Sequence, residues 1–169
     1  MAEALVTLLL FAIALSLIGA LVREYGRIFN TVSEREMALE AGLYALERIR
    51  SESQEAVAWI TPAVGGTGDS PELVFDKLDP AAMPARLPDP PAVAGPWNPL
   101  DPADLQRVRY FVDQAGLQRE AGGETLPMAS AVLSLPASNE SDRSVRVHLA
   151  VRQGDRTVFY SCRLLRGTR

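Results

Sequence analysis

The chain of 169 residues contains one cysteine, Cys162, and one histidine, His148. A single cysteine cannot form an internal disulfide, so a disulfide framework and a metal site of clustered thiols are both excluded. His148 falls on the polar side of an alternating segment, and Cys162 falls on the apolar side of another. We interpret the histidine as an exposed strand residue and the cysteine as a core residue. Because no nucleophile and base can be assembled around either of them, we predict that the protein is not an enzyme.

Proline is absent from the N-terminal part of the chain, because all twelve prolines lie between Pro62 and Pro136. Proline interrupts helices and is common in loops. We therefore predict two parts, which are an N-terminal transmembrane and amphipathic helix over residues 1–60 and a β-rich globular head with proline-rich loops over residues 61–169.

Charged residues are absent from Ala4 to Val22, where the sequence reads ALVTLLLFAIALSLIGALV. At 1.5 Å per residue a helix of this length spans about 28 Å, close to the ~30 Å hydrocarbon core of a bilayer. The segment therefore predicts one membrane span. A secretory signal peptide is the alternative, but the run has no preceding basic region, exceeds the usual length and lacks a small-x-small cleavage site.

The helical pattern continues beyond the span without a proline. Apolar residues recur there at spacings of three, four and seven, namely Tyr25, Ile28, Val32, Leu39, Leu43, Leu46 and Ile49. This periodicity predicts an amphipathic helix. We expect its apolar face to pack on the head through Leu39, Leu43, Leu46, Ile49 and Val57. An unrelated coiled coil after the span, as in a sensor or chemoreceptor, is the alternative interpretation.

Short segments of alternating apolar and polar residues predict strands in the head. They cover residues 72–78, 106–113, 129–135 and 144–152, and a C-terminal hairpin turns at Gln153–Arg156 before Val158, Tyr160, Cys162 and Leu164 alternate inward. A helix followed by antiparallel strands is an α+β order. The predicted fold is a long N-terminal helix, half membrane span and half amphipathic, packed on an antiparallel β-sheet head.

Glu3 places a carboxylate at the start of the apolar helix, where an unpaired charge entering lipid is costly. The stretch from Glu3 through Val6, together with Leu8 to Ile13, resembles the start of mature type IV pilins and type II secretion pseudopilins, which have the pattern F-T-L-x-E-x-L-V-A-L-A-I. In that family the glutamate neutralises the N-terminal amine of a neighbouring subunit. The resemblance therefore implies that Glu3 is an assembly contact.

A second resemblance lies in the head. Trp97–Leu100, Leu105–Tyr110 and Leu117–Arg119 are similar to the J-type minor pseudopilin, in which a W-x-N-P segment precedes an L-Q-R-V-x-Y strand and a second strand follows. Here Trp97 and Asn98 are adjacent, without the family's intervening residue. The two resemblances together imply a pilin-like fold.

The function implied by these resemblances is that of a structural minor subunit of a type II secretion pseudopilus or a type IV pilus-like filament. Its expected partners are other pilin-like subunits and the inner membrane, with a periplasmic head and no small-molecule substrate. The alternative is a single-pass, membrane-anchored signalling or adhesion protein with a binding head.

The charges beside the span predict a different topology from the resemblance. Arg23 and Arg27 follow the apolar run and no basic residue precedes it, so the positive-inside rule would place the head in the cytoplasm. A basic leader would reverse this orientation. Our hypothesis is that Met1 occupies the family's third mature position.

Charged residues of the head suggest neither a cofactor nor a nucleic-acid site. Calcium is considered because pilin-like proteins bind it with loop carboxylates, but the acids show no EF-hand spacing and we interpret them as solvated; they are Asp69, Asp76, Asp79, Asp89, Asp101 and Asp104. The net charge of −4 gives no general attraction to nucleic acid. Seven arginines from Arg143 onward are interpreted as a solvated strand face, with DNA or an acidic partner as the alternative.

Overall fold

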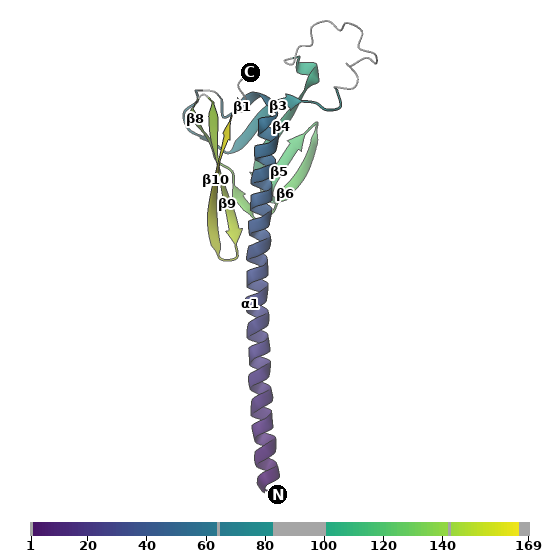
Figure 1. Cartoon of the computed structure of the whole chain (residues 1–169), viewed down its shortest axis with the longest axis vertical. Coiled ribbons are helices and arrows are strands. Elements are labelled where there is room, and N and C mark those ends of the chain that lie inside the picture. Colours follow the sequence, from purple (N-terminus) through teal and green to yellow (C-terminus); the bar gives the residue numbers. More distant parts are fainter. Residues whose placement is uncertain (1, 64, 83–100, 142, 166–169) are drawn as a thin grey trace. The chain divides into compact units, whose positions relative to one another are not determined.

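The computed structural model describes residues 2–63, 65–82, 101–141 and 143–165. Contacts within the chain form two compact units, Met1–Met37 and Ala38–Arg169, and each is described by itself. Helix α1 runs from Ala2 to Gln54 and supplies residues to both units. The elements are labelled in Figure 1.

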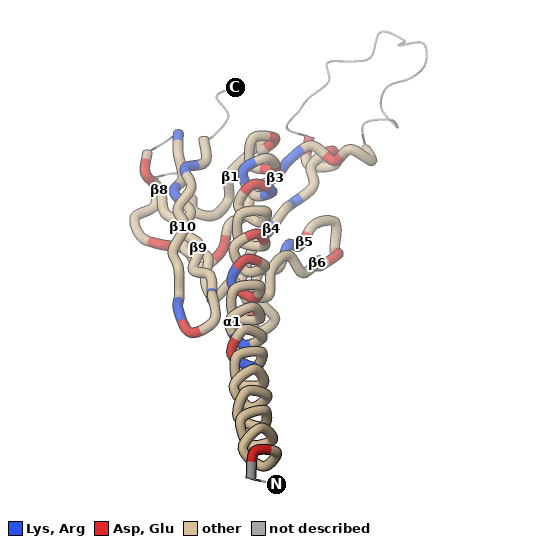
Figure 2. The backbone as a smooth tube through the Cα atoms, turned by 60° about the horizontal axis from the view of Figure 1, so that its bottom comes forward, with Lys and Arg blue, Asp and Glu red and all other residues tan. Residues whose placement is uncertain are grey.

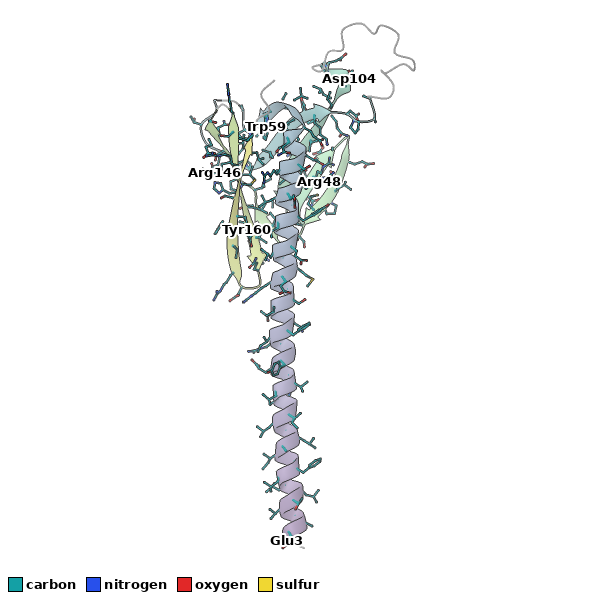
Figure 3. All side chains as sticks on the ribbon, in the orientation of Figure 1. Glu3, Arg48, Trp59, Asp104, Arg146 and Tyr160 are labelled. Carbon is teal, nitrogen blue, oxygen red and sulfur yellow. The ribbon has the colours of Figure 1, made fainter. Side chains whose placement is uncertain are left out.

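The N-terminal unit consists of the first part of α1. Its large apolar side chains extend from the helix on every side (Figure 3), and those from Leu5 to Met37 are exposed to between 47% and 73%. The lack of proline and the run of leucine, alanine and isoleucine explain why this segment is helical.

The second unit combines the end of α1 with two antiparallel sheets (Figure 1). One sheet has the order β1-β3-β4-β5-β6, and the other has the order β10-β9-β8-β2 with β7 also paired to β9. The α+β prediction of a long helix on an antiparallel head is therefore confirmed, with two sheets where one was expected. The elements are β1 Ala56–Thr61, β2 Asp69–Ser70, β3 Glu72–Leu78, the 3-10 helix Pro102–Asp104, β4 Leu105–Asp113, β5 Gly116–Ala121, β6 Glu124–Ala129, β7 Val132–Ser134, β8 Ala137–Ser141, β9 Ser144–Gln153 and β10 Arg156–Leu165.

One hydrophobic core joins the end of α1 to both sheets. Ala45, Leu46 and Ile49 of the helix are buried in the same cluster as Phe75 and Tyr110 of the first sheet. The second sheet contributes inward-facing residues of β9 and β10, which are Val145, Val147, Leu149, Val151 and Leu164. Each such side chain contributes roughly 1.5 to 3 kcal/mol when it is fully buried, so this stretch of α1 is an integral part of the head.

The end of the predicted helix is wrong. Instead of continuing to residue 60, α1 ends at Gln54, and residues 56–61 form strand β1 along β3. The sequence AVAWIT of this strand contains β-branched and aromatic residues, which favour extended structure. Val57, which was assigned to the helix face, therefore lies in a strand.

The buried face of the helix also differs from the prediction. Leu46 and Ile49 are buried as expected, whereas Leu39 is only half-buried and Leu43 is 49% exposed. Small residues occupy the centre of the face instead: a Cβ placed on Gly42 would lie 3.0 Å from a methyl group of Val151. The helix thus approaches β9 closely at Gly42, and Leu43, the next residue, faces another side of the helix.

The strand predictions are confirmed at 72–78, 106–113, 144–152 and in the C-terminal hairpin, where β9 and β10 pair from Gln153–Arg156 to Ser144–Leu165. The single strand predicted over 129–135 is confirmed only at its centre. Residue 129 ends β6, a turn follows, and β7 covers Val132–Ser134. Strands β1, β2, β6 and β8 were not predicted.

Candidate functional site

The first candidate site is the apolar part of α1. This helix is the one in the described chain that is long and apolar enough to cross a membrane, with a mean hydropathy of 2.8 in its most apolar window. None of that window is buried by the protein itself. A continuous apolar surface of this length is compatible with a single membrane span.

Glu3 lies in the first turn of α1, at the end of the apolar run (Figure 3). Its backbone carbonyl accepts a hydrogen bond of 2.9 Å from the Thr7 hydroxyl. Among the residues that the structure describes, the Glu3 carboxylate has no hydrogen-bond or ion-pair partner. Its side chain is exposed at the N-terminal end of the helix.

Charged residues mark the other end of the apolar run. Figure 2 shows a stretch of α1 without charged residues, which separates the acidic residue near the N-terminus from the next charged residues of the helix. Arg23 Nε donates 3.2 Å to the Gly19 carbonyl, and Arg27 pairs with Glu24 at 3.0 Å. These side chains define the end of the segment that can lie in hydrocarbon.

An apolar stripe continues beyond these charges, still within the N-terminal unit. Tyr25, Ile28, Phe29 and Val32 are spaced by three and four residues and lie on one side of the helix. Tyr25 and Phe29 are each 73% exposed. This stripe has the pattern of a helix-packing surface, and the unit described here does not cover it.

The second candidate site is a buried ionic cluster at the end of α1 inside the head. The Glu52 carboxylate, with only 4% of its side chain exposed, accepts hydrogen bonds from Tyr110 at 2.9 Å and from Arg119 Nε at 3.0 and 3.1 Å. Arg48, one turn earlier on the helix, approaches the same carboxylate at 2.7 Å. The cluster therefore ties α1 to β4 and β5.

The cluster also fixes the charge states of its members. Burial by itself would raise the pKa of Glu52, but the hydrogen bonds from Arg119 and Tyr110 and the charge of Arg119 outweigh it and lower the pKa. Burial and the neighbouring Glu52 carboxylate raise the pKa of Tyr110, so the phenol stays protonated and donates. Burial by itself would lower the pKa of Arg119, but the hydrogen bond to Glu52 and the charge of Glu52 raise it. The arrangement is a satisfied ion pair with no free nucleophile or base.

Glu52 was missed by the sequence analysis. It lies three residues after Ile49 and seven after Ala45, so helical spacing places it on the buried face. A charge on such a face is retained only when partners satisfy it. That position was the available signal for a buried ion pair, although its partners could not be named from the helix alone.

Residues of the head motif lie on two faces of the first sheet. Tyr110 and Arg119 point inward to Glu52, whereas Arg107 pairs with Asp76 at 3.0 Å and Arg109 pairs with Glu72 at 2.7 Å on the other face. The motif therefore forms the α1–sheet junction and an outer ladder of ion pairs. Trp97–Leu100, the remaining part of the motif, lies outside the described residues.

The other residues singled out by sequence do not come together. His148 is half-buried on β9, and Cys162 is a free thiol packed at the margin of the core. Asp79 and Asp101 each accept a hydrogen bond from a nearby backbone amide, and Asp89 lies outside the described residues. In the described ranges no three His, Cys, Asp or Glu side chains form a group that could hold a metal ion.

Comparison with known proteins gives no relative: no family model, no curated protein and no solved structure matches the chain.

Proposed function

We propose that this protein is a pilin-like structural subunit, most similar to a minor pseudopilin, that assembles with other such subunits through its N-terminal helix. The observation that carries the proposal is the continuity of α1 from an uncovered apolar segment that begins with Glu3 to a stretch buried in the head core. A helix that only anchored a head would not need to form part of that head's core.

Two features of the helix support assembly over simple anchoring. Glu3 supplies a carboxylate at the end of the apolar run, and the resemblance to pilins implies that the N-terminal amine of a neighbouring subunit pairs with it. The exposed stripe of Tyr25, Ile28, Phe29 and Val32 supplies a packing surface beyond the segment that lipid would cover. Helices of neighbouring subunits would bury both features.

On this proposal the head lies outside the cytoplasm and the apolar part of α1 leaves lipid when the subunit joins a filament. The protein contributes structure and not turnover. It needs no cofactor for this role, and its partners are other single-helix subunits of the same class, first in the inner membrane and then in a pseudopilus or a type IV pilus-like filament.

Site-specific photo-crosslinking in the protein's own host cells tests the proposal. Benzoylphenylalanine at Phe29 lies in the apolar stripe, and the same group at Asn30 points to another side of the helix. We expect the yield of protein adducts from position 29 to exceed the yield from position 30 by about tenfold. This ratio corresponds to a difference of about 1.4 kcal/mol in favour of protein contact at position 29. Equal or absent protein adducts at both positions would instead support the anchored signalling or adhesion protein.

A further inference from the structure

The edges of the two sheets differ in how well they are protected. An unpaired edge strand invites pairing with another chain, and proteins usually blunt such edges with bulges, prolines or short strands. Here β1 has two register shifts, and β2 is only two residues long. Strand β6 contains Pro127, and its pairing with β5 shifts register between Leu117 and Gln118. In the described chain the edge strands β1, β2 and β6 are therefore blunted, and β7, which pairs only with β9, is three residues long.

Strand β10 is the exception. It has ten residues without proline, pairs with β9 in unbroken register, and has no other strand beside it among the described residues. Ten residues in a strand extend about 33 Å. This is long enough to template a full additional strand.

The ladder shows which backbone groups of β10 face outward. Gln153 and Arg156 flank a two-residue turn, so they form a hydrogen-bonded pair. Along the ladder, hydrogen-bonded pairs then alternate with pairs that are not hydrogen-bonded, and the pair next to the turn-flanking pair is of the second kind. His148 N and Arg152 N agree with this pattern, because they donate away from β10 to Pro136 O and Ala131 O at 2.9 and 2.8 Å. The amides and carbonyls that face away from β9 therefore belong to Thr157, Phe159, Ser161, Arg163 and Leu165.

The surroundings of this edge specify the side chains of an added strand. On its inner side lies an open groove of about 670 Å³ in which Leu43, Leu46 and Cys162 offer apolar contacts beside the polar residues Glu47, Arg50, Ser51, Gln54 and Ser161. On its outer side the strand would lie beside Phe159, which is 74% exposed.

The outer face of the second sheet adds a charge requirement. Arg163 and Arg146 are opposite each other and share Glu140, and Arg152 on the same strand face is exposed. The face therefore carries a surplus of positive charge. A second copy of β10 would bring further arginines to this edge, and like charges placed opposite each other destabilise strand pairing.

We propose that the free edge of β10 binds an extended segment of a partner protein in which apolar residues alternate with acidic ones. The backbone of this segment would pair with the five outward residues of β10. Its apolar side chains would contact Leu43, Leu46 and Cys162 at the margin of the groove, and its carboxylates would face the arginines. This binding surface is separate from the helix surface of the proposed function and does not depend on it.

A peptide-binding experiment on the full chain in nonionic detergent micelles tests the proposal. The probe is a fluorescent ten-residue peptide of alternating valine and glutamate, with a valine–lysine peptide and a scrambled valine–glutamate peptide as controls. We expect binding of the first peptide only, detected by fluorescence anisotropy, and a loss of affinity as salt is added. No binding, or equal binding of the lysine or scrambled peptide, would overturn the proposal.

Two variants at Ser161 locate the binding site on the edge. Ser161→Pro removes an outward amide that makes no bond to β9, and proline is tolerated on edge strands for this reason. We expect this variant to bind the peptide at least about tenfold more weakly, a loss of about 1.4 kcal/mol, whereas Ser161→Ala retains the amide and binds like the unchanged protein. Equal affinity of the two variants would contradict edge pairing.

Hydrogen exchange in the unchanged protein provides a readout that does not depend on folding of the proline variant. Adding the valine–glutamate peptide should slow amide exchange at residues 157, 159, 161, 163 and 165 and leave residues 158, 160 and 162 unchanged. Uniform or absent protection would overturn the proposal. Self-association of the protein that Ser161→Pro abolishes would identify a second copy as the occupant and would also overturn it.

Discussion

The phenolic hydroxyl of Tyr110 donates a 2.9 Å hydrogen bond to the carboxylate of Glu52, a residue 58 positions earlier in the chain. Tyr110 belongs to the strand motif that suggested a minor pseudopilin, and Glu52 belongs to the last turns of α1. With Arg119 they form the polar contact that joins the helix to the first sheet.

Replacing Glu52 should substantially lower the free energy of unfolding of the head. Glu52→Gln removes the negative charge that Arg119, itself only 12% exposed, requires, and breaking a buried pair in this way costs about 3 to 5 kcal/mol. We expect a decrease of that size in the free energy of unfolding, measured by urea denaturation of the full chain in detergent. Glu47→Gln, at an exposed position of the same helix, should change it by less than about 0.5 kcal/mol. A similar effect of both substitutions would show that the ion pair does not stabilise the head.

The same pair should give the protein an acid-sensitive component of stability. Because the folded-state pKa of Glu52 is lowered, the unfolded chain binds more protons in the interval between the two pKa values. Stabilisation from Glu52 is complete above the unfolded-state pKa of about 4.3 and is lost as the pH falls through the folded-state value. The difference in unfolding free energy between the unchanged protein and Glu52→Gln should therefore shrink from about pH 6 to about pH 3. A constant difference would contradict a lowered pKa.

The turn from β4 to β5, which positions Arg119, should depend on Gly116. Its φ is +105°, and a Cβ there would lie 2.4 Å from the carbonyl oxygen of Ala129. Gly123 also has a positive φ, of +82°, but a Cβ there meets nothing within 4 Å. We expect Gly123→Ala to cost about 1 kcal/mol and Gly116→Ala to cost about 2 to 4 kcal/mol, since only the latter adds a backbone clash. Thermal unfolding followed by circular dichroism distinguishes the two, and equal losses would contradict the clash.

The local elements were largely predictable from sequence, because periodicity records which side of an element is buried. The apolar run, the strand at 72–78 and the C-terminal hairpin were all found in this way. The end of α1 was not, because no proline or glycine separates Gln54 from the strand at Ala56, and only pairing with β3 makes that segment extended.

Long-range relationships were the main limit of the sequence analysis. Glu52 gave a signal through its position on the buried face, but Tyr110 and Arg119 come from strands whose arrangement periodicity does not determine. The free edge of β10 was equally hidden, because a strand's sequence does not reveal whether it has one neighbour or two. Glu3 was singled out because a charge beside an apolar run is visible without any tertiary contact, and its role as an assembly contact stays a prediction.

The central claim is that Glu3 meets a cationic group of a neighbouring subunit when the helices assemble. The most direct measurement is the yield of photo-crosslinked adducts from benzoylphenylalanine at Phe29 in three backgrounds, which are the unchanged chain, Glu3→Gln and Glu3→Asp. The account predicts a several-fold decrease for Glu3→Gln, since an uncompensated charge at the membrane edge costs less than the about 2 to 3 kcal/mol it costs at the centre, and substantial recovery for Glu3→Asp, which retains the charge. An unchanged yield in Glu3→Gln, at equal amounts of membrane-inserted protein, would contradict the account.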